Sequence, residues 1–395
     1  MVFPKPIVAA LAGTLSIAPR VLSTPLGVRS TPAPWSKFND NAIFYPGTNY
    51  TSWRTLYART LQLPDQSILL TWEDYDNTVA PDEAYFPIYR STDGGTTFQN
   101  KTRVYDQVNG WGNRYQPFLF TLPQPMGDFD AGTILLAGAS VPSDLSQAYI
   151  DLYVSSDAGS SWEWISHIAY GSGPETVDNG NKAVWEPFLL LYNSQLVCYY
   201  SDQTDPAHAQ KLVLVTTTDL KSWSAPTDVV AQPNYGDRPG MATVAYSEMS
   251  KKYVLTFEYC GGPNAPGCPV YHKVSDNPLE FGSVAPLALT PGNTNGPNGS
   301  PYVIWTPSSS GEGIFVATGS NVESLYVNTD AVDPNGWMPV DVGQWAAYSR
   351  SLRIISTPSS GNKLLIANGG NIGCAGSCYN YVADGVVDIP VYPAS

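Results

Sequence analysis

The chain has 395 residues, of which only 14% are charged, and its formal net charge is −14. An acidic chain of this kind disfavours binding to nucleic acid or to an anionic membrane surface, because both need clustered basic side chains. Hydrophobic residues make up 43% of the sequence, which is enough for a large core. We therefore expect neither nucleic acid nor a membrane as a partner.

The N-terminus has the pattern of a secretory signal peptide. Lys5 precedes an apolar run over residues 7–18, and this run is too short to span a bilayer. We predict a signal peptide over residues 1–23, a single domain over residues 24–395, and a secreted, extracellular protein.

Short strand-like runs follow along the rest of the chain, separated by Gly, Pro, Asn and Asp turns, and no long helical period is present. Six units can be distinguished, and each opens with a strand, a turn and a second strand. The units begin at Arg54, Arg114, Trp185, Arg238, Ser300 and Arg350.

A second motif, Ser-x-Asp-x-Gly-x-x-aromatic, follows five of these six openings. The clear copies span residues 90–98 (RSTDGGTTF) and 154–162 (VSSDAGSSW), and shorter copies contain Asp219, Asp276 and Asp330. Ser and Asp side chains bond nearby amides in such turns, and Gly adopts a backbone conformation that other residues resist. We therefore assign these Asp turns to the scaffold, between the third and fourth strands of each sheet.

Six sheets arranged radially form a β-propeller, so the predicted fold is an all-β six-bladed propeller with Asp-box turns. A radial arrangement also protects sheet edges that would otherwise be exposed. The sixth unit has no Asp turn. We expect residues 379–387 to supply its third strand and residues 42–45 its outermost strand, so that the two chain ends close the ring.

The cysteines fit an exported protein. Cys260 and Cys268 flank one Gly/Pro-rich loop, and Cys374 and Cys378 flank another, so we predict two short-range disulfides. Cys198 lies in an apolar run and is expected to be a buried free thiol. Acceptor sequences for N-glycosylation begin at Asn49, Asn100 and, more weakly because a proline follows the motif, Asn298.

The first strands of a propeller surround its axis, so the start of each first strand and the end of each second strand should share one pocket. Two carboxylates stand out at these places, Glu186 in AVWEPFLL and Glu258 in VLTFEYC. A glycosidase needs two carboxyl groups, one that attacks the sugar carbon or activates water and one that protonates the leaving oxygen. The alternative is that either glutamate only pairs with an inner arginine.

Aromatic and polar side chains at the same places suit a sugar, whose C–H faces stack on rings and whose hydroxyls form hydrogen bonds. We predict these substrate-binding residues: Arg54, Trp72, Arg114, Tyr115, Gln116, Trp185, Asp202, Arg238, Tyr259, Tyr348 and Arg350. No cofactor and no metal site are predicted, because the acidic cluster at Asp74 and Asp76 is more simply a solvated loop.

The Asp turns, the six units and the segments VWEPFLL (184–190) and LTFEY (255–259) resemble the fungal exo-1,5-α-L-arabinanases of glycoside hydrolase family 93. The resemblance covers essentially the whole mature chain. It implies a sialidase-like propeller that releases arabinobiose from the non-reducing ends of linear α-1,5-arabinan with retention of configuration. Glu186 matches the nucleophile and Glu258 the general acid/base. We expect a monomer that acts on arabinan, and loops 263–269 and 290–298 are candidates for blocking the pocket.

Two other functions stay open. Sialidases also contain Asp turns, and Arg54, Arg238 and Arg350 could bind a substrate carboxylate, although no Phe-Arg-Ile-Pro segment occurs. A non-catalytic propeller lectin would repeat its binding residues from unit to unit, whereas the inner positions differ here.

Overall fold

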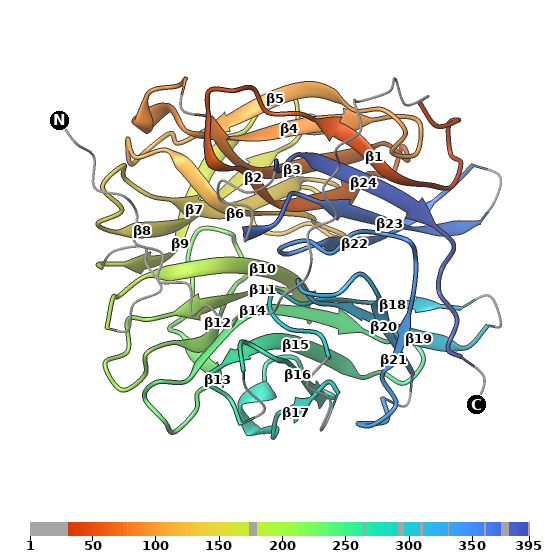
Figure 1. The fold of residues 1–395 in the computed structure, drawn as a ribbon. Helices are drawn as coiled ribbons and strands as arrows, with labels where there is room; N and C mark the ends of the chain where they lie inside the picture. Colours follow the sequence, from red (N-terminus) through yellow and green to blue (C-terminus); the bar gives the residue numbers. More distant parts are fainter. Residues whose placement is uncertain are drawn as a thin grey trace.

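The computed structural model describes residues 31–76, 78–173, 180–263, 266–290, 296–308, 311–330, 332–358, 361–372 and 379–393. The predicted signal peptide lies outside this range. The described residues form six four-stranded antiparallel sheets around a ring (Figure 1). The helical turns among them are η1 (Pro81–Glu83) and η2 (Phe281–Ser283), and none of the helices described has the length and hydrophobicity needed to cross a membrane.

Five of the sheets, or blades, each use four consecutive strands in their order along the chain. Blade 1 consists of β2 (Tyr50–Gln62), β3 (Ile68–Asp76), β4 (Tyr85–Ser91) and β5 (Gln99–Tyr105). Blade 2 consists of β6 (Asn113–Thr121), β7 (Ile134–Ser140), β8 (Ala148–Ser155) and β9 (Glu163–Gly171). Blade 3 consists of β10 (Val184–Tyr192), β11 (Gln195–Asp202), β12 (Lys211–Thr217) and β13 (Thr227–Val230). Blade 4 consists of β14 (Arg238–Tyr246), β15 (Tyr253–Cys260), β16 (Val270–Ser275) and β17 (Leu287–Ala288). Blade 5 consists of β18 (Tyr302–Pro307), β19 (Gly313–Thr318), β20 (Leu325–Thr329) and β21 (Met338–Val340).

Blade 6 joins the two ends of the chain, as the sequence predicted. It consists of β22 (Ser351–Ser356), β23 (Asn362–Asn368), β24 (Val382–Val387) and, on the outside, β1 (Phe38–Phe44). The N-terminal strand therefore begins before the predicted residue 42. The first strands contact one another in ring order, and β22 contacts β2, so the ring is closed.

The core lies between neighbouring blades, because the inner strands are covered on both faces. Strand β7 (ILLAGAS) is buried along its whole length, whereas the outer strand β9 alternates between buried and exposed residues. Phe86 of blade 1 packs with Leu136 and Tyr153 of blade 2 in one cluster. A Cβ at Gly138 would overlap the Phe86 ring, so glycine is required for this close contact.

The Asp turns are part of the scaffold. In the first copy, Ser91 Oγ donates to Asp93 at 2.7 Å and accepts the N–H of Gly95 at 2.9 Å. Gly95 has a φ of 93°, in the left-handed region that glycine tolerates. The third copy, in blade 3, reaches the preceding blade, because Trp223 Nε1 donates to Ser166 Oγ of blade 2 at 3.0 Å. These turns lie between third and fourth strands, as predicted.

The cysteine predictions are confirmed where the structure describes them. Cys260 and Cys268 form a disulfide, and Cys198 is a buried free thiol. Cys374 and Cys378 lie outside the described residues.

Candidate active site

Each of the first four blades has a β-bulge in its first strand, close to the propeller axis. At the bulge, a non-glycine residue adopts a left-handed conformation and the register with the second strand shifts. These residues are Tyr57 (φ 54°), Gln116 (φ 52°), Glu186 (φ 64°) and Met241 (φ 57°). Just before the first strands of blades 5 and 6, Ser300 (φ 45°) and Ser349 (φ 55°) share the conformation. Bulges change the direction of side chains, and strained residues of this kind gather at functional sites.

Three buried or partly buried glutamates accept a backbone N–H from a left-handed residue of the following blade. The three donor–acceptor pairs are Gln116 N to Glu73 at 2.9 Å, Met241 N to Glu186 at 2.9 Å, and Ser300 N to Glu258 at 2.8 Å. These left-handed residues therefore hold three carboxylates at one level of the ring, each across a boundary between blades.

Glu186 is itself a bulge residue and is only 9% exposed. Its Oε2 accepts hydrogen bonds from Ser201 Oγ at 2.7 Å and from Met241 N. Burial raises the pKa of Glu186, and the neighbouring charge of Glu258 raises it further. The two donors oppose this shift, because they stabilise the carboxylate form.

Glu258, at the end of β15, is partly exposed. Its Oε2 accepts the Ser300 N–H, and burial raises its pKa, while the positive charge of Arg238 acts in the opposite direction. Arg238 Nη2 also donates to Gln210 Oε1 at 2.9 Å. The guanidinium is therefore anchored near both glutamates, whose charged forms it favours.

Glu186 and Glu258 flank Gly240, the residue that pairs with Glu258 across the sheet. A Cβ at Gly240 would lie 3.4 Å from Glu258 Oε1 and 3.6 Å from Glu186 Oε2. These two oxygens are therefore separated by at most about 7 Å, a bound that includes the ~5–5.5 Å of retaining glycosidases. The structure thus brings together the two carboxylates selected from the sequence.

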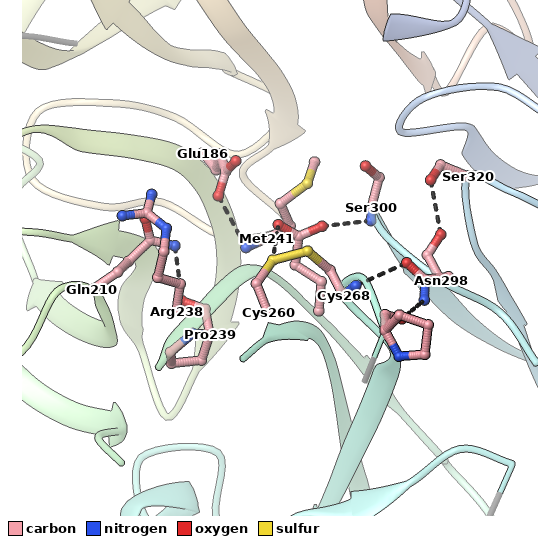
Figure 2. Close-up of a disulfide and its surroundings, with 12 residues drawn as sticks. Glu186, Gln210, Arg238, Pro239, Met241, Cys260, Cys268, Asn298, Ser300 and Ser320 are labelled. Carbon is pink, nitrogen blue, oxygen red and sulfur yellow. Dashed lines mark hydrogen bonds between the residues drawn. A yellow bond between two sulfur atoms is a disulfide. The ribbon is translucent and has the colours of Figure 1, made fainter. Parts of the chain in front are cut away.

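The Cys260–Cys268 disulfide and the side chain of Asn298 lie close together in the loops beside Ser300 (Figure 2). The Cys260–Cys268 disulfide places Cys260 Sγ 3.8 Å from Glu258 Oε1. Asn298 Oδ1 accepts the Cys268 N–H at 2.9 Å, and Asn298 Nδ2 donates to Pro266 O at 3.1 Å. The Asn298 side chain therefore fixes residues 266–268 against the segment that leads to the donor Ser300. Because its amide group already forms these hydrogen bonds, Asn298 is disfavoured as a glycan acceptor.

Several predicted substrate-binding residues surround the same level of the ring. The pKa of Tyr348 is raised well above its usual value by burial and then by the charges of Glu186, Glu258 and Glu73, so its phenol lies near all three carboxylates. Trp185 is partly exposed, and its indole N–H has no hydrogen-bond partner among the described residues.

The remaining polar candidates mainly brace loops. Arg54 stacks over the Tyr379 ring at 4.3 Å. Arg114 Nε donates to Val141 O at 2.6 Å, and Asp202 accepts the N–H of Thr204 at 2.7 Å. The Tyr115 ring lies 6.2 Å from that of Tyr75.

Three predicted substrate contacts lie in the interior instead. Trp72 is 0% exposed and packs against Phe44 and Tyr89. Tyr259 is buried and donates to Asp237 at 2.7 Å. The sequence placed both at the correct level of the ring, but adjacent residues of a strand point to opposite faces. The side chain of Trp72 therefore lies on the face of the sheet opposite that of Glu73, and the side chain of Tyr259 lies on the face opposite that of Glu258.

Arg350 is also 0% exposed. Its guanidinium donates to backbone oxygens that include Val322 O at 2.7 Å and Glu323 O at 3.0 Å. We therefore assign Arg350 to the support of the loop between β19 and β20 of blade 5.

The sequence analysis missed Glu73 as a site residue. A signal for it exists, since LTWE (70–73) on β3 repeats the pattern of LTFE (255–258) on β15. Glu73 is 2% exposed, and burial raises its pKa to about 7.

Two other features do not belong to this site. Glu258, Cys260 and Cys268 offer ligand atoms within 4.8 Å of one another, but the two sulfurs are bonded to each other and cannot act as thiolates. A cavity of about 480 Å³ lies at the closing blade, remote from the glutamates, and is lined by Lys37, Phe38, Asn39, Val342, Val386, Val387 and Asp388.

Two fungal enzymes of known structure are similar to this chain over most of its length. The GH93 α-L-arabinofuranosidase of Fusarium graminearum, in complex with arabinobiose, is 41% identical with a TM-score of 0.85, over 89% of this chain and 98% of that chain. Penicillium chrysogenum α-L-arabinanase, complexed with arabinobiose, is 38% identical with a TM-score of 0.83, over the same shares. A Hadza microbial sialidase is 12% identical with a TM-score of 0.55, over 89% of this chain and 68% of that chain, and shares only the fold. No protein-family model and no curated protein matches the chain.

Proposed function

Because the chain belongs to glycoside hydrolase family 93 and is an arabinan-hydrolysing enzyme, we propose that it removes arabinobiose from the non-reducing ends of linear α-1,5-L-arabinan with retention of configuration. The observation that carries this proposal is the position of Glu186 and Glu258 beside Gly240, which keeps their nearest carboxylate oxygens within about 7 Å of each other. Both similar fungal enzymes bind arabinobiose, which supports a disaccharide product.

In the first step, the Glu186 carboxylate attacks the anomeric carbon while the Glu258 carboxyl gives its proton to the glycosidic oxygen. The carbon–oxygen bond breaks, the shortened arabinan leaves as an alcohol, and an ester joins the disaccharide to Glu186. In the second step, the Glu258 carboxylate takes a proton from water, whose oxygen attacks the same carbon. The ester bond breaks, arabinobiose leaves, and both glutamates return to their initial states.

This assignment of roles agrees with the hydrogen bonds of the pair. Two buried carboxyl groups beside each other share a proton over part of the pH range, because one charge disfavours the other. Glu186 accepts two hydrogen bonds, from Ser201 and Met241, whereas Glu258 accepts one from Ser300. Donors stabilise the charged form, so the hydrogen bonds favour Glu186 as the carboxylate and Glu258 as the acid. Burial and the charge of Glu258 act in the opposite direction, because they raise the pKa of Glu186 to about 8.

Product analysis on linear arabinan tests the proposal. Wild type should release arabinobiose from the earliest times, and Glu186→Ala and Glu258→Ala should be almost inactive. With an aryl arabinobioside, whose leaving group needs no protonation, added azide should rescue both variants. The glycosyl azides should have opposite anomeric configurations, because azide replaces the nucleophile in one variant and the activated water in the other. Glu163→Ala, an exposed change on β9, is the matched control.

Two results would contradict the proposal. A ladder of random oligomers from wild type would exclude the exo mode, and an inverted anomer would exclude the covalent intermediate. Release of sialic acid without activity on arabinan would identify a sialidase, and unchanged glycan affinity with no turnover would identify a lectin.

We also propose that the protein is secreted. The Cys260–Cys268 disulfide supports this, because disulfides persist mainly in oxidising compartments. Asn49 and Asn100 are exposed, and their glycosylation, like the monomeric state, remains a prediction. Sequencing of the mature N-terminus from the culture medium should find a start near residue 24.

A further inference from the structure

Blade 1 repeats around Glu73 the structure that blade 4 forms around Glu258. Glu73 pairs across its sheet with Leu56, the residue before the bulge at Tyr57. Glu258 pairs with Gly240, which precedes the bulge at Met241 in the same way. The two glutamates therefore occupy equivalent positions in their blades.

The two carboxyl groups also accept the same kind of hydrogen bond, from a backbone N–H of the following blade. Gln116 N, from the bulge of blade 2, donates to Glu73 Oε1, and Ser300 N, at the start of blade 5, donates to Glu258 Oε2. In a closed ring of six, blades 1 and 4 are opposite each other, and Figure 1 shows β3 and β15 in opposite halves of the molecule. Glu73 is thus the residue of blade 1 that corresponds to the general acid Glu258 of the opposite blade.

Glu73 belongs to the same site as the catalytic pair. Two tyrosines, Tyr57 and Tyr348, connect them, because their ring centroids are 6.2 Å apart and the charges of both Glu73 and Glu186 act on each phenol. The pKa of Tyr57 is raised by burial and by the charges of Glu186 and Glu73, although Arg59 opposes this. Both phenols therefore lie near carboxylates from opposite sides of the ring.

Glu73 retains acceptor capacity in spite of its burial. Each carboxylate oxygen can accept two hydrogen bonds, and Glu73 accepts one on Oε1 from Gln116 N and one on Oε2 from Tyr75 OH at 2.8 Å. Beside it, Gln116 is 7% exposed, and its buried Oε1 has no hydrogen-bond partner among the described residues. Unpaired buried acceptors are costly and are explained when a ligand supplies the donors.

The direction of the substrate follows from the role of Glu258. The general acid protonates the departing oxygen, so the leaving part of the polymer lies on the side of blade 4. The sugar units that remain lie on the other side of the broken bond, and blade 1 is the blade opposite blade 4 in the ring. In an α-1,5-linked chain, the terminal unit has a free O5–H, whereas every interior unit has an ether oxygen there and no proton to donate.

We propose that Glu73, with Gln116, accepts the O5–H of the non-reducing terminal arabinofuranosyl unit and so selects chain ends over interior positions. This inference rests on the proposed function and deepens it. Glu73 acts as a specificity-determining residue that does not take part in bond breaking. The exo mode then has a chemical cause, because an interior unit would leave the acceptors of Glu73 and Gln116 without a donor.

A pair of substrates tests this inference without relying on folding of a variant. Arabinotriose and its analogue lacking the terminal 5-hydroxyl group should differ in kcat/KM with wild type by roughly 10- to 100-fold, the effect expected for a lost hydrogen bond to a charged group. Equal kcat/KM values for the two substrates would overturn the inference.

Glu73→Gln should slow hydrolysis of arabinotriose by a similar factor and remove most of the difference between the two substrates. A variant that is slow but keeps the full difference would show that Glu73 only supports the structure. Asp384→Asn is the matched control, because it changes a buried carboxyl in blade 6; it should keep the full difference.

Failure of the two proposals can be told apart. If wild type cleaves arabinotriose but ignores the missing hydroxyl, only the role of Glu73 is wrong. If wild type cleaves no arabinan, the proposed function is wrong, and calorimetric binding of the same two sugars then decides the role of Glu73. Tighter binding of arabinotriose that depends on Glu73 would support the role, and equal or absent binding would overturn it.

Discussion

Replacing Gly240 by alanine would place a methyl group close to both of the proposed catalytic carboxylates. The new Cβ would lie 2.8 Å from Gln210 Nε2, 3.4 Å from Glu258 Oε1 and 3.6 Å from Glu186 Oε2. The first distance is too short for a non-bonded contact. Gln210 must therefore move and weaken its hydrogen bond to Pro239 O, which is 2.9 Å long.

The expected loss of stability is small, because one neutral hydrogen bond contributes about 0.5–1.5 kcal/mol. The expected loss of activity is larger. A displacement of about 1 Å at a reacting group can lower the rate ~100-fold, and the methyl group also fills space beside both carboxylates. We therefore expect kcat on linear arabinan to fall by about 100-fold, while Tm falls by no more than about 4 °C.

The assay is the release of reducing sugar from linear arabinan, with thermal unfolding measured on the same samples. Gly236→Ala is the matched control, because a Cβ there has no atom within 4 Å, and it should behave like wild type. If Gly240→Ala is as active as Gly236→Ala, the two glutamates do not act across Gly240 and our interpretation of the site is wrong.

Three further predictions concern charge and covalent structure. Ser201→Ala removes a donor from the Glu186 carboxylate and raises its pKa. The acid limb of the pH profile of kcat/KM should therefore move up by about 1 pH unit. An unmoved limb would contradict the proposal that Glu186 must be ionised for activity. Replacing Cys260 and Cys268 by serine should lower the free energy of unfolding by roughly 2–3 kcal/mol and reduce kcat, because the disulfide supports the loop beside Glu258, the proposed general acid. Unchanged kinetics in the folded variant would show that the loop keeps its position without the disulfide. Burial raises the pKa of Asp384 in the folded state, so this carboxyl favours folding only while it is protonated, and stability falls as pH rises through the folded-state pKa. Asp384→Asn should therefore be more stable than wild type near neutral pH but not below about pH 4, as measured by urea unfolding, and the reverse order would contradict this burial argument.

The fold could be predicted from the sequence because its signals are local. Side chains of the Asp turns bond their own backbone, so Ser91, Asp93 and Gly95 indicate the turn without knowledge of the rest of the chain. The closure of blade 6 followed from counting units, since the last unit lacked a strand that only the N-terminus could supply.

The site could be predicted only in part, because the orientation of a side chain depends on register. Glu186 and Glu258 were found from their positions at strand ends, whereas Trp72 was chosen in place of its neighbour Glu73. The bulges were not predictable, because a left-handed residue such as Met241 has no sequence signature of its own and is held there by contacts between blades.

Backbone N–H groups hold the three carboxylates in place, so the positions of the carboxylates do not depend on which side chains the donor residues carry. The side chains of Gln116, Met241 and Ser300 have no property in common, and each donor is a backbone N–H, which every amino acid but proline can provide. Mutation at these positions can reshape the walls around a sugar without releasing an acid from its place. A propeller built this way is free to acquire new substrates while its reaction stays the same.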